Sequence, residues 1–139
     1  MINKNSDQTK SLVLAGISLI NMGRFFDAHE TLESAWHLEK APIRTLYKGM
    51  IQFSVACFHA ERKNWIGAMR VLLRARGNLA PFIQEDSMID VSDVLLQIDN
   101  LSERINRVSI SNDKNQELLI VPYVKTKGAS DEPINPESG

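Results

Sequence analysis

Apolar residues recur along most of the chain at intervals of three and four, the spacing of one face of an α-helix. This pattern predicts a first helix over about residues 9–21 and a second over about 24–38, with Gly23 between them as a natural left-handed stop. The apolar stripe of the second helix consists of Phe25, Ala28, Leu32 and Trp36. The chain is therefore expected to begin as a helical hairpin.

Two further helices are predicted in the middle of the chain. Pro42 follows a short loop and is expected in the first turn of the third helix, because proline suits that position. The third helix has little polar face before Glu61, so we expect it to be central. Asn64 is a natural cap for a fourth helix, which Gly77 or Pro81 should end or bend.

A fifth helix and a tail complete the predicted organisation. Asp90 is the expected cap of the last helix, whose apolar face continues to Ile105. The fold class is therefore all-α, a small closed bundle of about five helices over residues 8–107. Residues 108–139 lack apolar periodicity and are expected to form a flexible, largely disordered tail. Its apolar run 118–124 is expected to dock in extended form, on its own domain rather than on a partner.

The two hairpins share a repeated pattern. Four small or apolar positions of the second helix recur in the fourth at an offset of 40 residues: Phe25, Ala28, Leu32 and Ala35 match Trp65, Ala68, Leu72 and Ala75. Small residues at such positions allow close helix approach, as in tetratricopeptide-like hairpins. Those repeats have a period of about 34 residues and need roughly three copies, so a closed bundle fits this chain better than an array.

Composition narrows the functional classes. The formal net charge is −1, from 16 basic and 17 acidic residues, so no global field would draw the chain to nucleic acid or to an anionic membrane. No apolar run approaches the ~20 residues that cross a bilayer, and the N-terminus lacks the order of a secretory signal. The single cysteine, Cys57, lies in an apolar stretch and suits a reducing compartment. We expect a cytoplasmic protein.

One polar constellation stands out, on the second predicted helix. His29 and Glu33 are four residues apart, and Trp36 follows three residues later, so all three share one edge of the helix. Glu30 lies further round, towards the polar flank. His59 and Gln52, seven residues apart on the third helix, are the expected partners across the hairpin, because a polar side chain in so apolar a helix needs a partner.

Three interpretations of these residues remain open. In the first they are structural, with Glu33 accepting a hydrogen bond from His29 or from the Trp36 indole. In the second, His29, Glu33 and His59 bind a divalent metal, with Gln52 or Glu30 in support. In the third, Glu33 orients His29 for acid/base catalysis.

The metal interpretation lacks a template. Zinc peptidases carry a second histidine four residues after the first, and Glu33 occupies that place here. Di-iron bundles need two Glu-x-x-His motifs, and none occurs. No phosphate-binding loop, nucleophile elbow or Cys-x-x-Cys is present either. The cofactor is therefore undetermined, with a divalent metal as the alternative to none.

A longer pattern carries a family resemblance: Gly23-x-Phe25-Phe26-x-Ala28-His29-Glu30-x-x-Glu33-x-x-Trp36, then Lys48-Gly49-Met50-Ile51-Gln52, and then His59, Asn64, Gly67 and Ala68. It resembles the DUF309 family of small helical proteins of unknown function, over roughly Leu19 to Ile105. The resemblance implies a helical bundle and signature positions at His29, Glu30, Glu33, Trp36, Gln52 and His59. Lys48 departs from the glutamine expected there, and Lys63 from a small residue.

These observations lead to two functional hypotheses. The favoured one is a non-catalytic module that binds a protein partner or a second copy of itself, because the hairpins are duplicated and no catalytic set is complete. The alternative is a hydrolase-like, metal-dependent or acid/base enzyme using His29, Glu33 and His59. Neither nucleic acid nor a membrane is an expected partner.

Overall fold

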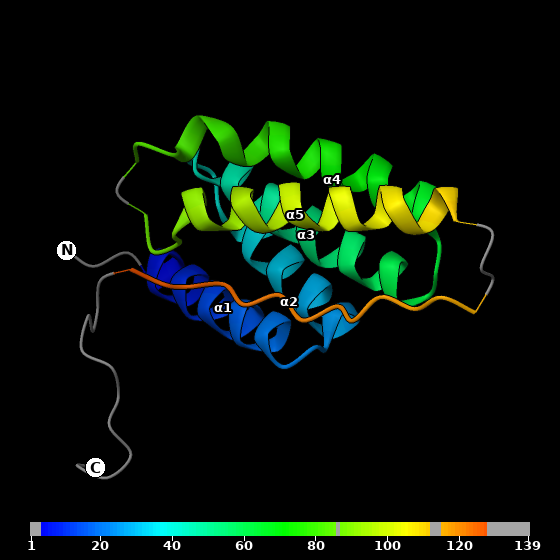
Figure 1. Cartoon of the computed structure of the whole chain (residues 1–139). Coiled ribbons are helices and arrows are strands. Elements are labelled where there is room, and N and C mark those ends of the chain that lie inside the picture. The colour runs from blue at the N-terminus through cyan, green and yellow to red at the C-terminus, as the bar shows by residue number, and fades with distance from the viewer. Residues whose placement is uncertain (1–3, 86, 112–114, 128–139) are drawn as a thin grey trace, which may run out of the picture.

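The computed structural model describes residues 4–85, 87–111 and 115–127 (Figure 1). Within these residues the chain forms five α-helices and one short 3-10 helix: α1 (Lys4–Asn21), α2 (Phe25–Leu38), α3 (Arg44–Glu61), α4 (Trp65–Leu79), η1 (Ala80–Phe82) and α5 (Val91–Ile110). The predicted all-α bundle of about five helices is confirmed. None of the helices in the described part is long and apolar enough to cross a membrane.

Local signals in the sequence set most helix ends. Gly23 has a φ of +79°, the left-handed conformation that ends α1 and that glycine adopts without strain. The side chain of Asn64 accepts a hydrogen bond from the Gly67 N–H, and that of Asp90 accepts one from the Asp93 N–H, so both predicted caps are confirmed. The prediction that Pro42 lies in the first turn of α3 is wrong. α3 begins at Arg44, and Pro42 lies in the turn that precedes it.

The repeated pattern corresponds to repeated backbone geometry. Lys63 occupies the place of Gly23 and also has a positive φ, +61°. The next residue in each turn, Arg24 or Asn64, donates its N–H to the carbonyl oxygen five residues earlier at 2.9 Å. The shared alanines are all 0% exposed: Ala28, Ala35, Ala68 and Ala75. The hairpins α1–α2 and α3–α4 are therefore two copies of one structural unit.

Each helix packs against its neighbour in sequence, and α3, which packs on both α2 and α4, is central as predicted. Close approach depends on glycine at two places. A Cβ atom at Gly16 of α1 would lie 2.5 Å from Leu32 Cγ, and one at Gly49 of α3 would lie 2.7 Å from Leu79 Cγ. Both leucines are fully buried, so neither can move aside without disturbing the core.

After α5 the chain returns across the bundle. Residues 115–127, called the C-terminal segment below, run back from the end of α5 towards its start (Figure 1, orange). Near the start of α5, Asp90 N–H donates to the Lys125 carbonyl at 3.0 Å, and Ile89 and Thr126 form an antiparallel bridge. The segment is extended, and it lies between α5 and the α1–α2 hairpin.

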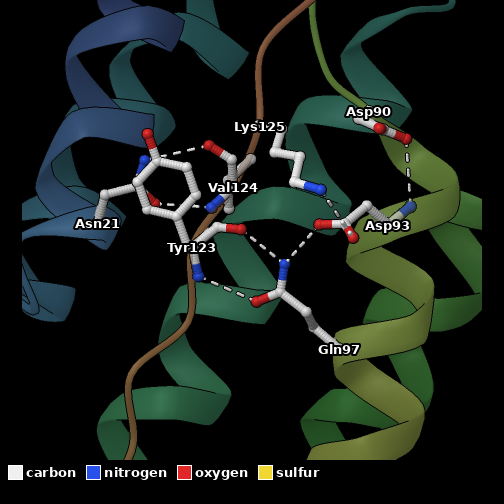
Figure 2. A network of polar contacts seen from close by, with 7 residues as sticks. All are labelled: Asn21, Asp90, Asp93, Gln97, Tyr123, Val124 and Lys125. Carbon is white, nitrogen blue, oxygen red and sulfur yellow. Dashed lines mark hydrogen bonds and ion pairs between the residues drawn. The ribbon is translucent and has the colours of Figure 1, made fainter.

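Two side-chain amides hold the backbone of the C-terminal segment (Figure 2). Asn21, the last residue of α1, accepts from Val124 N–H at 2.7 Å and donates to the Val124 carbonyl at 3.1 Å. Gln97 of α5 accepts from Tyr123 N–H at 3.0 Å and donates to the Tyr123 carbonyl at 2.6 Å. In an extended chain the N–H and C=O of one residue point to the same edge, and those of the next residue point to the opposite edge, so each amide meets its own residue.

Side chains of the C-terminal segment alternate between the bundle and solvent. Ile120 and Val124 are 8% and 1% exposed, whereas Leu119, Val121 and Tyr123 are 61–71% exposed. This period of two is that of a strand with one buried face. The predicted tail, residues 108–139, begins inside α5, which continues to Ile110. Residues 112–114 and 128–139 of that tail lie outside the described residues. The domain limits at residues 8 and 107 stay a prediction.

Gly16→Ala should destabilise the protein by about 1–3 kcal/mol, because the added methyl group overlaps Leu32 in a packed core. Gly77→Ala is the matched control. Gly77 lies in α4, and a Cβ atom there would meet nothing within 4 Å, so alanine should stabilise the helix by up to about 1 kcal/mol. Urea unfolding followed by circular dichroism measures both. Equal stability of the two variants would contradict the close approach of α1 and α2.

Candidate functional site

The predicted edge of α2 contains a short chain of polar contacts. His29 Nε2 lies 3.2 Å from Glu33 Oε2, and His37 Nε2 lies 3.9 Å from Glu33 Oε1. The side chains of His29, Glu33 and His37 are 29%, 46% and 65% exposed. Solvent therefore screens these pairs, which contribute on the order of 0–1 kcal/mol to stability.

His29 also lines an apolar pocket between α2 and α3. The pocket has a volume of about 210 Å³, and six residues line it: Phe25, Phe26, His29, Val55, Phe58 and His59. The Phe26 ring centroid lies 6.0 Å from that of His29 and 6.0 Å from that of Phe58. Phe26 is 55% exposed although its ring is large and apolar. Below, these six residues are called the phenylalanine pocket.

His59 reaches the same pocket from the last turn of α3. The Asn64 amide orientation is fixed, because its Oδ1 accepts from the Gly67 N–H at 3.1 Å. Its Nδ2 therefore donates to His59 Nδ1, 3.3 Å away. Nδ1 of His59 is thus an acceptor in this arrangement, and the ring proton is on Nε2. His59 and His29 share the pocket, but each ring has a different polar partner.

The other predicted site residues lie elsewhere. Gln52 accepts a hydrogen bond from Asn78 Nδ2 at 2.7 Å, so it links α3 to α4 and does not face the polar edge of α2 as expected. Glu30 is exposed, and its side chain has no hydrogen bond or ion pair in the part of the chain that the structure describes. Trp36 does not bond to Glu33. The six predicted residues therefore do not form one cluster.

Trp36 instead joins the end of α2 to the start of α3. The Arg44 guanidinium carbon lies 4.1 Å from the centre of its ring, and Lys48 Nζ lies 4.8 Å from it. Arg44 also donates to the Trp36 carbonyl at 3.4 Å. Cation–π contacts of this kind contribute about 0.5–2 kcal/mol each. Sequence analysis missed this role, although Arg44 and Lys48 are one helical turn apart and their shared face was predictable.

The described residues contain no preformed metal site. No three side chains of His, Cys, Asp or Glu in residues 4–85, 87–111 and 115–127 lie close enough together to hold one ion. His29 and Glu33 supply two neighbouring donors, and His59 is turned towards Asn64.

Sequence analysis missed two residues of the pocket, Phe26 and Phe58. The signal that could have identified them is that each lies off the buried stripe of its helix.

Two buried groups on α3 have altered acidity. Burial, together with the Glu39 carboxylate, raises the pKa of Tyr47 to about 12. Burial, with a smaller effect of Glu61, raises the pKa of the Cys57 thiol well above its ordinary value. A thiol that stays protonated is a poor nucleophile, and Cys57 is fully buried. Cys57 therefore packs as an apolar residue.

These features define an all-α bundle of two repeated helical hairpins and a closing helix, with an apolar pocket between the hairpins. Residues 13–71 match the model of the DUF309 family, a domain of unknown function. The resemblance predicted from the sequence is confirmed over this part of the chain, which includes α2, α3 and all six predicted site residues. No curated protein and no solved structure matches the chain.

The raised pKa of Tyr47 predicts a loss of stability in alkali. The neutral phenol is favoured in the folded protein, so its contribution is complete below the unfolded pKa of about 10 and disappears as pH rises to about 12. The sequence has two tyrosines, so Tyr123→Phe leaves Tyr47 as the only one. Ultraviolet absorbance of tyrosinate in this variant should show a midpoint near pH 12. A midpoint near 10 in folded protein would contradict burial of the phenol.

Proposed function

We propose that the chain is a non-catalytic module that binds a protein partner through the phenylalanine pocket. The observation that carries this proposal is the exposed apolar surface at its rim. Phe26, which lines the pocket, is 55% exposed. A large aromatic residue at the mouth of an apolar pocket is typical of the few residues that contribute most of the affinity in protein interfaces.

The charges around the pocket favour a particular partner. The Arg62 guanidinium carbon lies 4.4 Å from the centre of the Phe58 ring, and Arg62 has no ion pair within the described residues. His29 and His59 place polar side chains in the lining of the same pocket. We therefore infer a partner segment with an aromatic or aliphatic side chain that enters the pocket and a neighbouring carboxylate that meets Arg62.

A protein of this kind would act inside the cell, in the cytoplasm. The only cysteine is a free, buried thiol, which is compatible with a reducing compartment. Self-association through the same pocket is a second form of the proposal, in which the partner is another copy of the chain. Self-association differs from binding of another protein in one measurable property: the average molecular mass of the purified protein would rise with its concentration.

The second candidate function is a hydrolase-like enzyme that uses His29, Glu33 and His59, with or without a divalent metal. One observation favours it: both histidines line the same pocket, and Glu33 is 3.2 Å from His29. It requires movement of His59 away from Asn64, or a metal that draws the three side chains together. The geometry supports it less well than it supports binding.

Phe26→Asp should weaken partner binding, because it places a charge at the apolar pocket. A photo-crosslinking amino acid at position 26 identifies candidate partners in cells, and one at position 110 reports background, since Ile110 is 72% exposed on α5. Partners specific to position 26 are then purified and titrated against the wild-type and variant proteins. We expect Phe26→Asp to weaken binding at least about tenfold and Ile110→Asp to leave it unchanged.

Equal affinity of both variants for every such partner would contradict the proposal. Light scattering of the wild-type protein tests self-association in the same preparations.

Metal analysis of protein purified without chelator tests the second candidate function, the metal-dependent enzyme. A stoichiometric metal that is lost in His29→Ala would overturn the non-catalytic proposal and support the enzyme.

A further inference from the structure

A second and larger cleft lies on the other side of α3, under the C-terminal segment. Its volume is about 480 Å³, within the range of about 300–1,000 Å³ that is usual for small-molecule sites. Its accessible surface is about as polar as it is apolar. Leu96, Val121 and Pro122 supply the apolar part, above the buried side chains of Phe53, Cys57, Leu101 and Ile120, and Gln97, Asn100 and Arg104 supply the polar part. None of these residues lines the phenylalanine pocket, so the two sites are separate.

The C-terminal segment forms one wall of this cleft and is held in place independently of any ligand. Asn21 and Gln97 hold its backbone at Tyr123 and Val124 (Figure 2). Lys125 adds an ion pair to Asp93, with Nζ 3.7 Å from Oδ1. The segment leaves a cleft, open to solvent, between residues 120–122 and α5. A cleft that the fold keeps open next to a fixed wall is suited to a ligand.

The polar edge of the cleft is basic. Arg104 of α5 is half-buried and donates one hydrogen bond, at 2.6 Å, to the Leu119 carbonyl. It has no carboxylate partner among the described residues, whereas Arg76 is paired with Asp99 and Arg107 with Glu103. A guanidinium has five N–H donors, so most of those of Arg104 remain available.

Asn100 adds a second polar side chain to the same edge of the cleft. It lies one helical turn before Arg104 on α5, so the two side chains are neighbours on one face of the helix. Asn100 lines the cleft, is exposed, and has no hydrogen bond from its side chain in the described part of the chain. A guanidinium with donors still available pairs well with a carboxylate, and the neighbouring Asn100 amide can add a hydrogen bond to it.

We propose that this cleft binds a small organic carboxylate with an apolar body, such as a medium-chain fatty acid. The carboxylate pairs with Arg104 and Asn100, and the chain lies against the exposed side chains of Leu96 and Val121 and against Pro122. Because the ligand contacts the C-terminal segment, its binding and the docking of that segment stabilise each other. The site is independent of the partner-binding role of the phenylalanine pocket.

Octanoate is the probe, and octanol, which has no charge, is the matched control ligand. Titration followed by calorimetry and by amide NMR shifts of the full chain should show one octanoate bound per protein, with shifts in α3, α5 and residues 119–124. Octanol should bind at least about tenfold more weakly, because a hydrogen bond to a charged group is lost. Absence of octanoate binding, or shifts confined to other residues, would overturn the proposal.

Variants separate the cleft from non-specific binding. Arg104→Gln should remove the preference for octanoate over octanol, and Arg107→Gln should retain it, because Arg107 is exposed and paired with Glu103. Arg104 also bonds to the C-terminal segment, so a second variant leaves that contact intact. Leu96→Glu, at a 67% exposed position of the cleft, should abolish octanoate binding through charge repulsion.

Ile66→Glu is the control for Leu96→Glu, at a position of α4 that is 74% exposed and does not line the cleft. It should bind octanoate like the wild-type protein, and so should Phe26→Asp. Binding that is unchanged in Leu96→Glu would overturn the proposal. A loss of octanoate binding in Phe26→Asp would assign the ligand to the phenylalanine pocket and would also overturn it.

Discussion

The hydrogen bonds from Asn21 and Gln97 to the C-terminal segment are the interaction on which the shape of the molecule depends. α1 and α5 stand at the two ends of a row of helices in which each packs on its neighbour in sequence. The segment lies between them, and its peptide groups need partners wherever they are removed from water. Two amide side chains supply donor and acceptor together, as a neighbouring strand would. The bundle is thereby closed without a sixth helix.

This closure gives α3 a different role on each of its two sides. Val55 and Phe58 line the phenylalanine pocket towards α2, and Phe53 and Cys57 line the cleft towards α5. The same turns of α3 therefore support both candidate sites, with apolar residues on two different faces of the helix. Its polar residue Gln52 is satisfied by Asn78 and stabilises the contact with α4, so it takes part in neither site.

Helix positions were predictable because their signals are local. The three-and-four spacing of apolar residues, the left-handed Gly23 and the caps Asn64 and Asp90 all act within one or two turns. The repeat of the two hairpins was also predictable, because equivalent positions in the second and fourth helices carry similar residues. Gln52 was assigned the wrong neighbour, since periodicity gives the face of a helix and does not say which helix packs there.

Contacts between distant residues were not predictable in the same way. Asn21 lies 103 residues from Val124, and no spacing rule connects them. The alternating pattern of residues 118–124 indicated an extended run, but not the amides that hold it. Phe26 was overlooked because it lies off the buried stripe of α2, and its exposure becomes informative only beside Phe58. The polar edge of α2 was correctly expected to bring His29 to Glu33.

Native-state hydrogen exchange of the Tyr123 and Val124 amides shows directly whether Gln97 and Asn21 hold the C-terminal segment, because each proton is donated to one of these side-chain amides. Both should exchange much more slowly than in an unstructured peptide. Asn21→Ala should remove the protection at Val124, and Gln97→Ala should remove it at Tyr123. Exchange of both amides at the unstructured rate in the wild-type protein would contradict the account, as would protection that survives both substitutions.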